Sequence, residues 1–247
     1  MLLHTHPLFS VYFGDAQDSV YPDQFRAFAA KNNLLDHESC TQLKKVMRLD
    51  GLTFLHQTHS DQGILITDEQ DKTPFSQSPF CNFLFDGDYL ITNKEIALGV
   101  LTADCLPIVM YDKVHHVLAL VHAGWRGSVQ EIAVKAVAHM EQAFGTNPAH
   151  LCILFGPCAK TCCYTVTEEF RDHIATFPWA DRTMQKIGSD YHFDLPLFNT
   201  LLLEKDGIKS DAISLSYNVC TICNDNFFSH RRQGAHAGRQ MTVAWLK

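Results

Sequence analysis

The feature that most constrains this fold is a succession of four short, β-prone runs in the middle of the chain. They have the length of strands and are bounded by turn residues: residues 89–92, 96–102, 106–111 and 117–121. A turn beginning at Asp112 separates the last two runs, so we expect these two to pair. That pairing would bring residues at their outer ends to the same edge of a sheet.

An amphipathic helix is predicted directly after the last of these strands. Apolar side chains recur three and four residues apart from Val129 to Phe144, Ser128 and Glu131 form a capping box, and Gly145 follows the last turn. Helices and strands mix without strict alternation, which predicts a single α+β domain over residues 1–247, with mixed β-sheets flanked by helices. The other predicted helices are 23–31, 39–49, 167–175 and 194–205, and the other predicted strands are 8–13, 52–55, 151–155, 212–216 and 242–246; residues 68–78 are predicted to form a long loop.

Charge and hydropathy exclude several classes of protein. The chain carries 27 Asp+Glu against 20 Lys+Arg, and an acidic chain repels phosphate backbones, so nucleic acid is not an expected partner. No run reaches the ~18 consecutive apolar residues of a membrane span. The N-terminus lacks a basic region followed by an apolar run, so we expect a cytoplasmic protein with no export signal. The 9 cysteines are then expected to be reduced.

Cys105 and His122 form the first candidate site. Cys105 lies in the break between two predicted strands, and His122 lies at the carboxyl end of the strand expected to pair beside it. A thiolate with an imidazole suits zinc or copper, although the same pair could be a nucleophile and its base. A third reading is a buried thiol beside an ordinary histidine. Asp104, next to Cys105, is a candidate acid or base, or a residue that orients the site.

Two further histidines, His56 and His59, stand three residues apart in a β-like stretch. Neighbouring strand positions alternate between faces, so their side chains would point in opposite directions. We therefore expect at most one of them to be a metal ligand.

A glycine loop follows His122 and contains Gly124, Arg126 and Gly127. Glycine lets the backbone approach a ligand closely, and the N–H groups of a following helix favour anions. The loop is therefore a candidate phosphate site, although a simple tight turn from strand to helix would have the same sequence.

Three arginines near the C-terminus are candidate anion ligands: Arg231, Arg232 and Arg239. A group of arginines in a glycine-containing loop of an acidic protein can hold a carboxylate or a phosphate. A solvated surface loop is the alternative.

Five other cysteines fall into two clusters, Cys158, Cys162 and Cys163 in one, Cys220 and Cys223 in the other. Together they could form a structural zinc site. However, the first cluster lacks the usual ligand spacing, and only the second is a C-x-x-C motif. The sequence therefore favours the site around Cys105.

Taken together, these motifs resemble the YfiH-like family. Its members are labelled laccase-domain or multicopper polyphenol oxidase proteins, and are described as purine nucleoside phosphorylases with adenosine deaminase side activity. The resemblance extends from about residue 52 to 246. It rests on Gln57-Thr58-His59, Asp88, Thr102-Ala103-Asp104-Cys105-Leu106-Pro107, His122-Ala123-Gly124-Trp125-Arg126-Gly127, residues 156–164 and Phe227-Phe228-Ser229-His230-Arg231-Arg232.

The resemblance implies a YfiH-like fold and a metal bound by His59, Cys105 and His122, and it selects His59 over His56. Three protein ligands leave a fourth position open, as in catalytic zinc sites, so zinc is expected in preference to copper. One triad implies one metal ion, which Cys105→Ala would remove and Cys223→Ala would leave in place.

The resemblance implies a zinc-dependent phosphorylase acting on adenosine or inosine, with adenosine deamination as a second activity. Phosphate would lie near the helix after Gly127 and an arginine such as Arg232 or Arg239, and purine nucleoside and phosphate are the expected small-molecule partners. One alternative is a cysteine hydrolase that uses Cys105 and His122 on an amide or peptidoglycan-precursor substrate. Another is a partner-binding protein whose metal is only structural.

Overall fold

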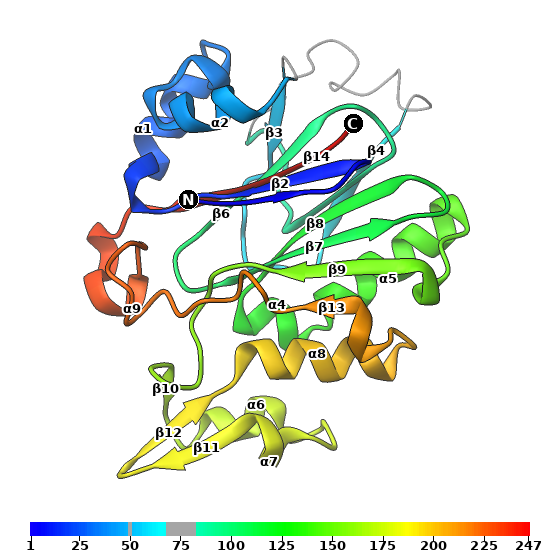
Figure 1. Ribbon diagram of the computed structural model, residues 1–247. Coiled ribbons are helices and arrows are strands. Elements are labelled where there is room, and N and C mark those ends of the chain that lie inside the picture. The colour runs from blue at the N-terminus through cyan, green and yellow to red at the C-terminus, as the bar shows by residue number, and fades with distance from the viewer. Residues whose placement is uncertain (49–50, 68–82) are drawn as a thin grey trace.

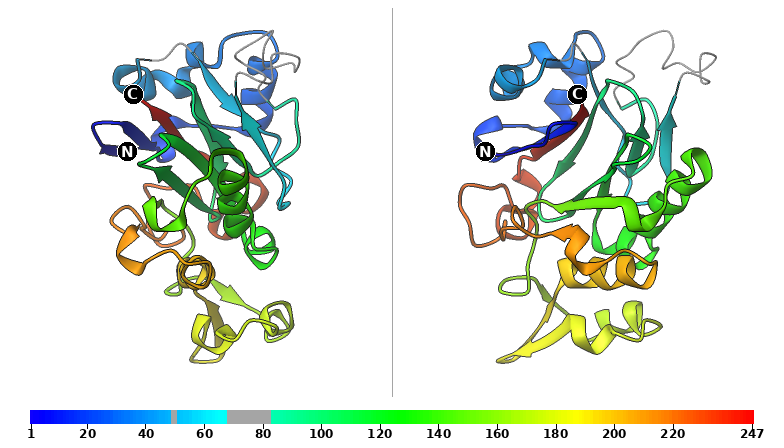
Figure 2. Two further views of the ribbon diagram at one scale, coloured as in Figure 1. Left: turned by 90° about the vertical axis from the view of Figure 1, so that its right-hand side faces the viewer. Right: turned by 45° about the vertical axis from the view of Figure 1, so that its right-hand side comes forward.

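Two β-sheets lie face to face at the centre of the protein, and helices cover the outer face of each (Figures 1 and 2). The computed structural model describes residues 1–48, 51–67 and 83–247. The architecture is α+β with mixed sheets, as the sequence predicts.

The two large sheets each combine parallel and antiparallel pairs. In the five-stranded sheet the last pair, β3 with β6, is parallel, and the order is β1 (Leu2–Thr5), β2 (Phe9–Phe13), β14 (Gln240–Leu246), β6 (Ala97–Thr102) and β3 (Leu52–Phe54). In the six-stranded sheet both edge strands pair in parallel, and the order is β13 (Ile213–Ser214), β9 (Leu151–Phe155), β7 (Leu106–Asp112), β8 (Val117–Ala123), β5 (Tyr89–Thr92) and β4 (Gly63–Ile66).

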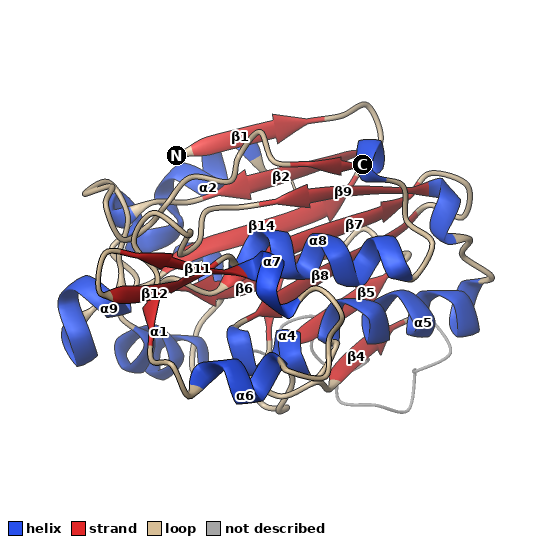
Figure 3. Cartoon of the chain, turned by 90° about the horizontal axis from the view of Figure 1, so that it is seen from below, coloured by secondary structure: helices blue, strands red, loops and turns tan. Residues whose placement is uncertain are grey.

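Three apolar clusters hold these layers together. Between the sheets, side chains such as Phe9 and Phe13 pack against Val109 and Leu118. The outer face of the six-stranded sheet packs against α5 (Ile132–Phe144) and α8 (Leu195–Lys205), which cross in front of its strands in Figure 3. The outer face of the five-stranded sheet packs against α1 (Pro22–Ala29) and α2 (Thr41–Val46). The strands of the central runs are thus buried on both faces.

The amphipathic helix after β8 begins differently from the prediction. A short helix α4 (Trp125–Val129) precedes α5, and Ser128 lies inside it, fully buried. Its hydroxyl accepts a hydrogen bond from Asn199 of α8, and Glu131 at the start of α5 makes no side-chain cap. The predicted capping box is therefore wrong, because the serine hydroxyl is hydrogen-bonded to a residue of another helix instead of capping α5. Gly145 ends α5 with a left-handed φ of 71°, as expected.

A small sheet below α8 has no counterpart among the predicted elements. It consists of β10 (Thr165–Val166), β12 (Asp190–Phe193) and β11 (Met184–Ile187), accompanied by α6 (Phe170–Ile174) and α7 (Ala180–Thr183) (Figure 1). The predicted cap of α8 is confirmed, since Asp194 accepts from the N–H of Leu197.

The remaining elements are a short helix and single turns of 3-10 helix: α9 (His230–Gln233), η1 (Ala16–Asp18), η2 (Leu34–Asp36), η3 (Glu38–Cys40), η5 (Pro148–His150), η6 (Ser210–Ala212) and η7 (Gly234–His236). The loop predicted at 68–78 lies outside the described residues, as does the end of the helix predicted at 39–49. In the described parts of the chain, no helix has the length and apolar character needed to cross a membrane.

Candidate metal centre and its pocket

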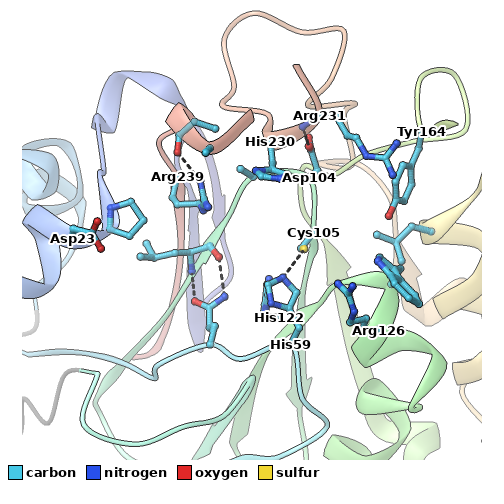
Figure 4. A pocket seen from close by; sticks show the side chains of 18 of the residues that line it. Asp23, His59, Asp104, Cys105, His122, Arg126, Tyr164, His230, Arg231 and Arg239 are labelled. Atoms are coloured by element: carbon cyan, nitrogen blue, oxygen red, sulfur yellow. Dashed lines mark hydrogen bonds between the residues drawn. The ribbon is translucent and has the colours of Figure 1, made fainter. Parts of the chain in front are cut away.

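A pocket opens where β8 ends and where the chain passes from β6 to β7 (Figure 4). Its volume of ≈ 680 Å³ falls within the range of small-molecule sites. Most of the predicted site residues line it: His59, Asp104, Cys105, His122, Arg126, Arg231 and Arg239.

Cys105 and His122 meet because β7 and β8 pair as predicted. The antiparallel register places Leu106 opposite Ala123 and Pro107 opposite His122. Cys105, immediately before β7, therefore lies at the same sheet edge as the end of β8. This convergence of the two strands is confirmed.

The three predicted metal ligands come together at this edge. The ligand atoms of His59, Cys105 and His122 all lie within 4.8 Å of one another. The Sγ of Cys105 is 3.8 Å from Nε2 of His59, and the two imidazole rings are 5.0 Å apart. Among the described residues, no fourth His, Cys, Asp or Glu belongs to this group.

Asp88 orients His122. Its carboxylate is buried, with 1% of the residue exposed, and its Oδ1 lies 2.8 Å from Nδ1 of His122. The backbones of the two residues are also hydrogen-bonded: the N–H of His122 donates to the Asp88 carbonyl over 2.7 Å. With Nδ1 engaged by the carboxylate, Nε2 is the ring nitrogen left for a metal, as in many histidine metal sites.

The same carboxylate holds the loop that carries His59. The backbone N–H groups of Thr58, His59 and Ser60 donate to Asp88 over 3.2, 3.1 and 2.6 Å. The backbone curls around the carboxylate at this point, and His59 adopts a left-handed φ of 59°. One buried carboxylate thus positions two of the three ligands.

Gln57 fixes the other side of this loop. Its side chain exchanges two hydrogen bonds with the backbone of Leu101 in β6, each 2.8 Å long. The Gln-x-His motif therefore joins the five-stranded sheet to the site.

The charges of the site depend on each other. Burial alone would raise the pKa of Asp88, but hydrogen bonds from His122 and Ser60 and the charge of His122 lower it to about 2. Burial also opposes ionisation of Cys105, yet the neighbouring His122 and His59 lower its pKa to about 6. Burial would lower the pKa of His122, but the Cys105 thiolate and Asp88 raise it to about 9. At neutral pH the metal-free site therefore contains a thiolate, a carboxylate and a protonated His122, so a cation that binds Nε2 of His122 must displace that proton.

In the metal-free protein, prepared with a chelator, Asp88 should make the free energy of unfolding fall as the pH is lowered. Its folded pKa lies below the ordinary value of 3.8, so its contribution is complete above pH 4 and is lost as the pH falls towards about 2. This amounts to about 2 kcal/mol of unfolding free energy. Urea titrations of the protein and of Asp88→Asn between pH 2 and 6 should converge at the acid end. A constant difference across this range would contradict the assignment.

Asp104 binds the C-terminal loop rather than facing the pocket as a free acid. Its buried carboxylate accepts from the hydroxyls of Thr221 and Ser229, over 2.7 and 3.0 Å, and from the N–H of Arg231 over 2.7 Å. The geometry favours the orienting role among those that the sequence left open.

The arginines differ in what they contact. Arg126 stacks on the ring of Trp125 at 4.5 Å, and Arg231 on that of Tyr164 at 4.8 Å. Arg239 also lines the pocket and donates to the carbonyls of Ala237 and Gly238 (Figure 4). The guanidinium of Arg232 instead donates to backbone carbonyls of its own loop: Thr221, Ile222, Asn224 and Phe227.

The two glycines of the loop also differ. A Cβ on Gly124 would lie 2.9 Å from Sγ of Cys105 and 3.1 Å from Cδ2 of His59. Gly127 lies within α4, where a Cβ would come 3.1 Å from the Ser60 carbonyl. The helix thus begins at Trp125, before Gly127 rather than after it as expected. Gly124 is the glycine that adjoins the metal site.

Gly124→Ala should weaken metal binding by roughly tenfold, because the new methyl group would push the sulfur and the imidazole apart, a cost of about 1–3 kcal/mol. Isothermal titration of the chelated protein with zinc measures the effect. The melting temperature of the chelated variant checks that the fold is retained. Unchanged affinity would mean that the ligands tolerate this displacement.

The other histidines considered from the sequence have partners elsewhere. His56 pairs with Asp86 over 2.7 Å, His115 with Asp112 over 2.8 Å, and His116 lies 2.9 Å from the hydroxyl of Tyr111. The structure therefore agrees with the choice of His59 over His56.

Several pocket residues were not identified from the sequence. Asp23 and Arg26 come from α1, far from the motifs, and no local pattern marks them. Trp125 and Tyr164 appeared in the motifs without an assigned role. Asp88 was also quoted without a role, although its position just before a strand that pairs with the His122 strand could have indicated one.

Comparison with known proteins identifies the relatives of this chain. Residues 32–247 match the family model described as multi-copper polyphenol oxidoreductase laccase. A purine nucleoside phosphorylase of Clostridium acetobutylicum is 31% identical over 237 residues, covering 95% of this chain and 90% of the relative. Purine nucleoside phosphorylase YlmD of Bacillus subtilis is 32% identical over 203 residues, or 81% of this chain and 72% of the relative.

The chain belongs to the YfiH-like laccase-domain family. A solved structure of the family, the hypothetical protein YfiH of Bacillus licheniformis, superimposes with a TM-score of 0.80 at 26% identity and covers 97% of this chain and 93% of that one. The resemblance inferred from the motifs is confirmed.

The family's multi-copper description finds little support in the ligands of this member. The pair His4 and His6, which has the His-x-His spacing, lies on and beside β1, where His4 contacts the hydroxyl of Tyr217 at 3.1 Å. His59, Cys105 and His122 form a group of three ligand atoms that could hold one metal ion.

Proposed function

We propose that this protein is a zinc-dependent purine nucleoside phosphorylase. The observation that carries the proposal is a three-ligand His-Cys-His group, with no fourth ligand among the described residues, at the wall of a cavity of nucleoside size. The names of the relatives from Clostridium acetobutylicum and Bacillus subtilis support the same reaction.

The donor set suits zinc. One thiolate and two neutral imidazoles match its preference for sulfur and nitrogen, and the hydrogen bond from His122 to Asp88 supplies the outer-shell partner that zinc histidines usually have. An ion held by three protein ligands would supply a Lewis acid beside the substrate.

The rest of the pocket suits a purine and an anion. Trp125 and Tyr164, each with a guanidinium stacked on its ring, place aromatic groups at the pocket wall against which a base can pack. Arg126, Arg231 and Arg239 provide positive charge for phosphate. In phosphorolysis, a phosphate oxygen bonds to C1′ of the ribose, the glycosidic bond breaks, and its electron pair leaves with the base, which takes up a proton.

Adenosine and inosine, each with and without phosphate, test this reaction. We expect free base and ribose 1-phosphate only when phosphate is present. Inosine formed from adenosine without phosphate would establish deamination as a second activity, in which water replaces the amino group and ammonia leaves. A zinc-loaded protein that forms none of these products would refute the proposal.

Arg126→Ala should raise the KM for phosphate by roughly 10-fold or more, since a hydrogen bond between charged groups contributes about 1.5–3 kcal/mol. Arg182→Ala, at an exposed position on α7 and outside the pocket lining, is the matched control and should leave the KM unchanged. Initial rates at varied phosphate and fixed inosine give both constants. Equal KM values in the two variants would exclude Arg126 as a phosphate ligand.

A cysteine hydrolase is the second candidate, because Asp88, His122 and Cys105 follow one another as in a catalytic triad. His59, 3.8 Å from the sulfur, has no role in such a triad but completes a metal site. Activity that survives removal of the metal and is lost on thiol alkylation would favour the hydrolase. The absence of a fourth ligand in the described part of the chain argues against a purely structural metal.

A further inference from the structure

A second group of metal-ligand side chains lies outside the triad. Cys162 and Cys163 lie in the turn that follows β9, and Cys220 and Cys223 lie in the loop that follows β13. The sequence disfavoured a joint site because the first pair lacks the usual spacing. In the folded chain, the ligand atoms of all four lie within 4.8 Å of one another.

We propose that Cys162, Cys163, Cys220 and Cys223 bind a second zinc ion through four thiolates. Zinc bonds sulfur at about 2.3 Å, so the sulfurs of a tetrahedral site are separated by about 3.8 Å. The Sγ atoms of Cys162 and Cys223 lie 4.0 Å apart. The four side chains therefore need to move very little to form such a site.

The C-x-x-C loop is held against the segment that leads to Cys162 and Cys163. The N–H of Cys158 donates to the Val219 carbonyl over 3.1 Å, and the N–H of Thr221 donates to the Cys158 carbonyl over 3.0 Å. Zinc would bind the thiolate forms of the four side chains and release their protons. The loop is fixed by the parallel bridge between Cys158 and Cys220.

These four cysteines differ from the cysteines that serve as core residues. Cys158 is fully buried, and its sulfur contacts the Asn218 amide at 3.2 Å. In the four-cysteine group, by contrast, Cys162 and Cys223 are exposed, so an ion can reach the cluster from solvent. A disulfide would need an S–S distance of about 2.05 Å, and all four cysteines are free.

A metal at this place would fasten two walls of the pocket together. Tyr164, which lines the pocket, directly follows Cys163. Thr221, between the other two ligands, donates to Asp104 over 2.7 Å, and Arg232 donates to the Ile222 carbonyl over 2.6 Å. The four-cysteine site is therefore a structural one that positions the C-terminal loop against the pocket. It revises the expectation that Cys223→Ala leaves the metal content unchanged.

Elemental analysis of the protein, purified under reducing conditions, tests the proposal without any activity measurement. We expect two zinc ions per chain in the unaltered protein, one in Cys105→Ala, one in Cys223→Ser and none in the double variant. Cys152→Ser, a half-buried position on β9 outside both groups, is the control and should retain two.

X-ray absorption of Cys105→Ala supplies an independent measurement if Cys223→Ser does not fold. The zinc that remains should have four sulfur neighbours at about 2.3 Å and no nitrogen. A Cys105→Ala protein free of zinc, or a zinc shell that contains nitrogen, would overturn the proposal. So would disulfides among these cysteines in the reduced, folded protein. None of these outcomes depends on whether the protein acts on nucleosides.

Discussion

Cys105→Ala should abolish phosphorolysis and weaken zinc binding at the triad by more than roughly 100-fold. Loss of a residue that only hydrogen-bonds to a metal ligand usually weakens binding by about 10- to 100-fold, and loss of a ligand itself should cost more. Cys105 is the one thiol of the triad, and its sulfur lies within 4.8 Å of a ring nitrogen of each histidine. Its replacement leaves two neutral ligands, which hold a divalent ion poorly. Competition with a chromogenic chelator measures the affinity, and inosine phosphorolysis measures the activity.

The fold should survive this substitution. Cys105 is half-buried in the break between β6 and β7, and the three apolar clusters do not include it. Melting temperatures of the two chelated proteins should therefore agree within a few degrees, and Cys152→Ala controls for loss of a thiol elsewhere. Full activity in metal-free Cys105→Ala would refute both the metal proposal and the hydrolase alternative.

Asp88→Ala should lower the free energy of unfolding by about 3–5 kcal/mol, the cost of breaking a buried ion pair by removing one partner. The substitution leaves His122 unpaired and removes the acceptor of three N–H groups in the 58–60 loop. Zinc affinity at the triad should also fall by 10- to 100-fold, because both histidines lose their orientation.

Asp86→Ala is the matched control two residues away. The side chain of Asp86 is 75% exposed and, among the residues that the structure describes, pairs with His56, so its loss should cost less than about 1 kcal/mol. Urea unfolding with and without chelator separates the stability effect from the metal effect. Similar losses in the two variants would mean that Asp88 has no special role.

The parts of the fold that local sequence specifies were predicted well. Strands β5 to β8 are apolar runs between turns, and the pairing of β7 with β8 follows from the short connection near Asp112. That pairing alone brings Cys105 to His122. His59 could be chosen only through the resemblance to the family, because its approach depends on a left-handed backbone wrapped around a distant carboxylate.

Features that depend on distant partners could not be predicted. Ser128 has the sequence of a helix cap, yet Asn199 binds its hydroxyl. Arg232 stands in a sequence typical of an anion-binding loop, but its guanidinium donates to the backbone carbonyls of the loop before it. The four-cysteine group was considered and disfavoured for the same reason: the spacing along the chain says nothing about two loops that meet through the bridge between Cys158 and Cys220.

The three hydrogen bonds that Asp104 receives have a consequence for how a substrate reaches the zinc. They tie residues 221–231 to the neighbour of a metal ligand, so this wall cannot swing outward without disturbing Cys105. On the opposite side the pocket is bounded by α1, through Asp23 and Arg26. We therefore expect the C-terminal wall to stay in place when a ligand enters the pocket, because any shift of this wall would also move Cys105.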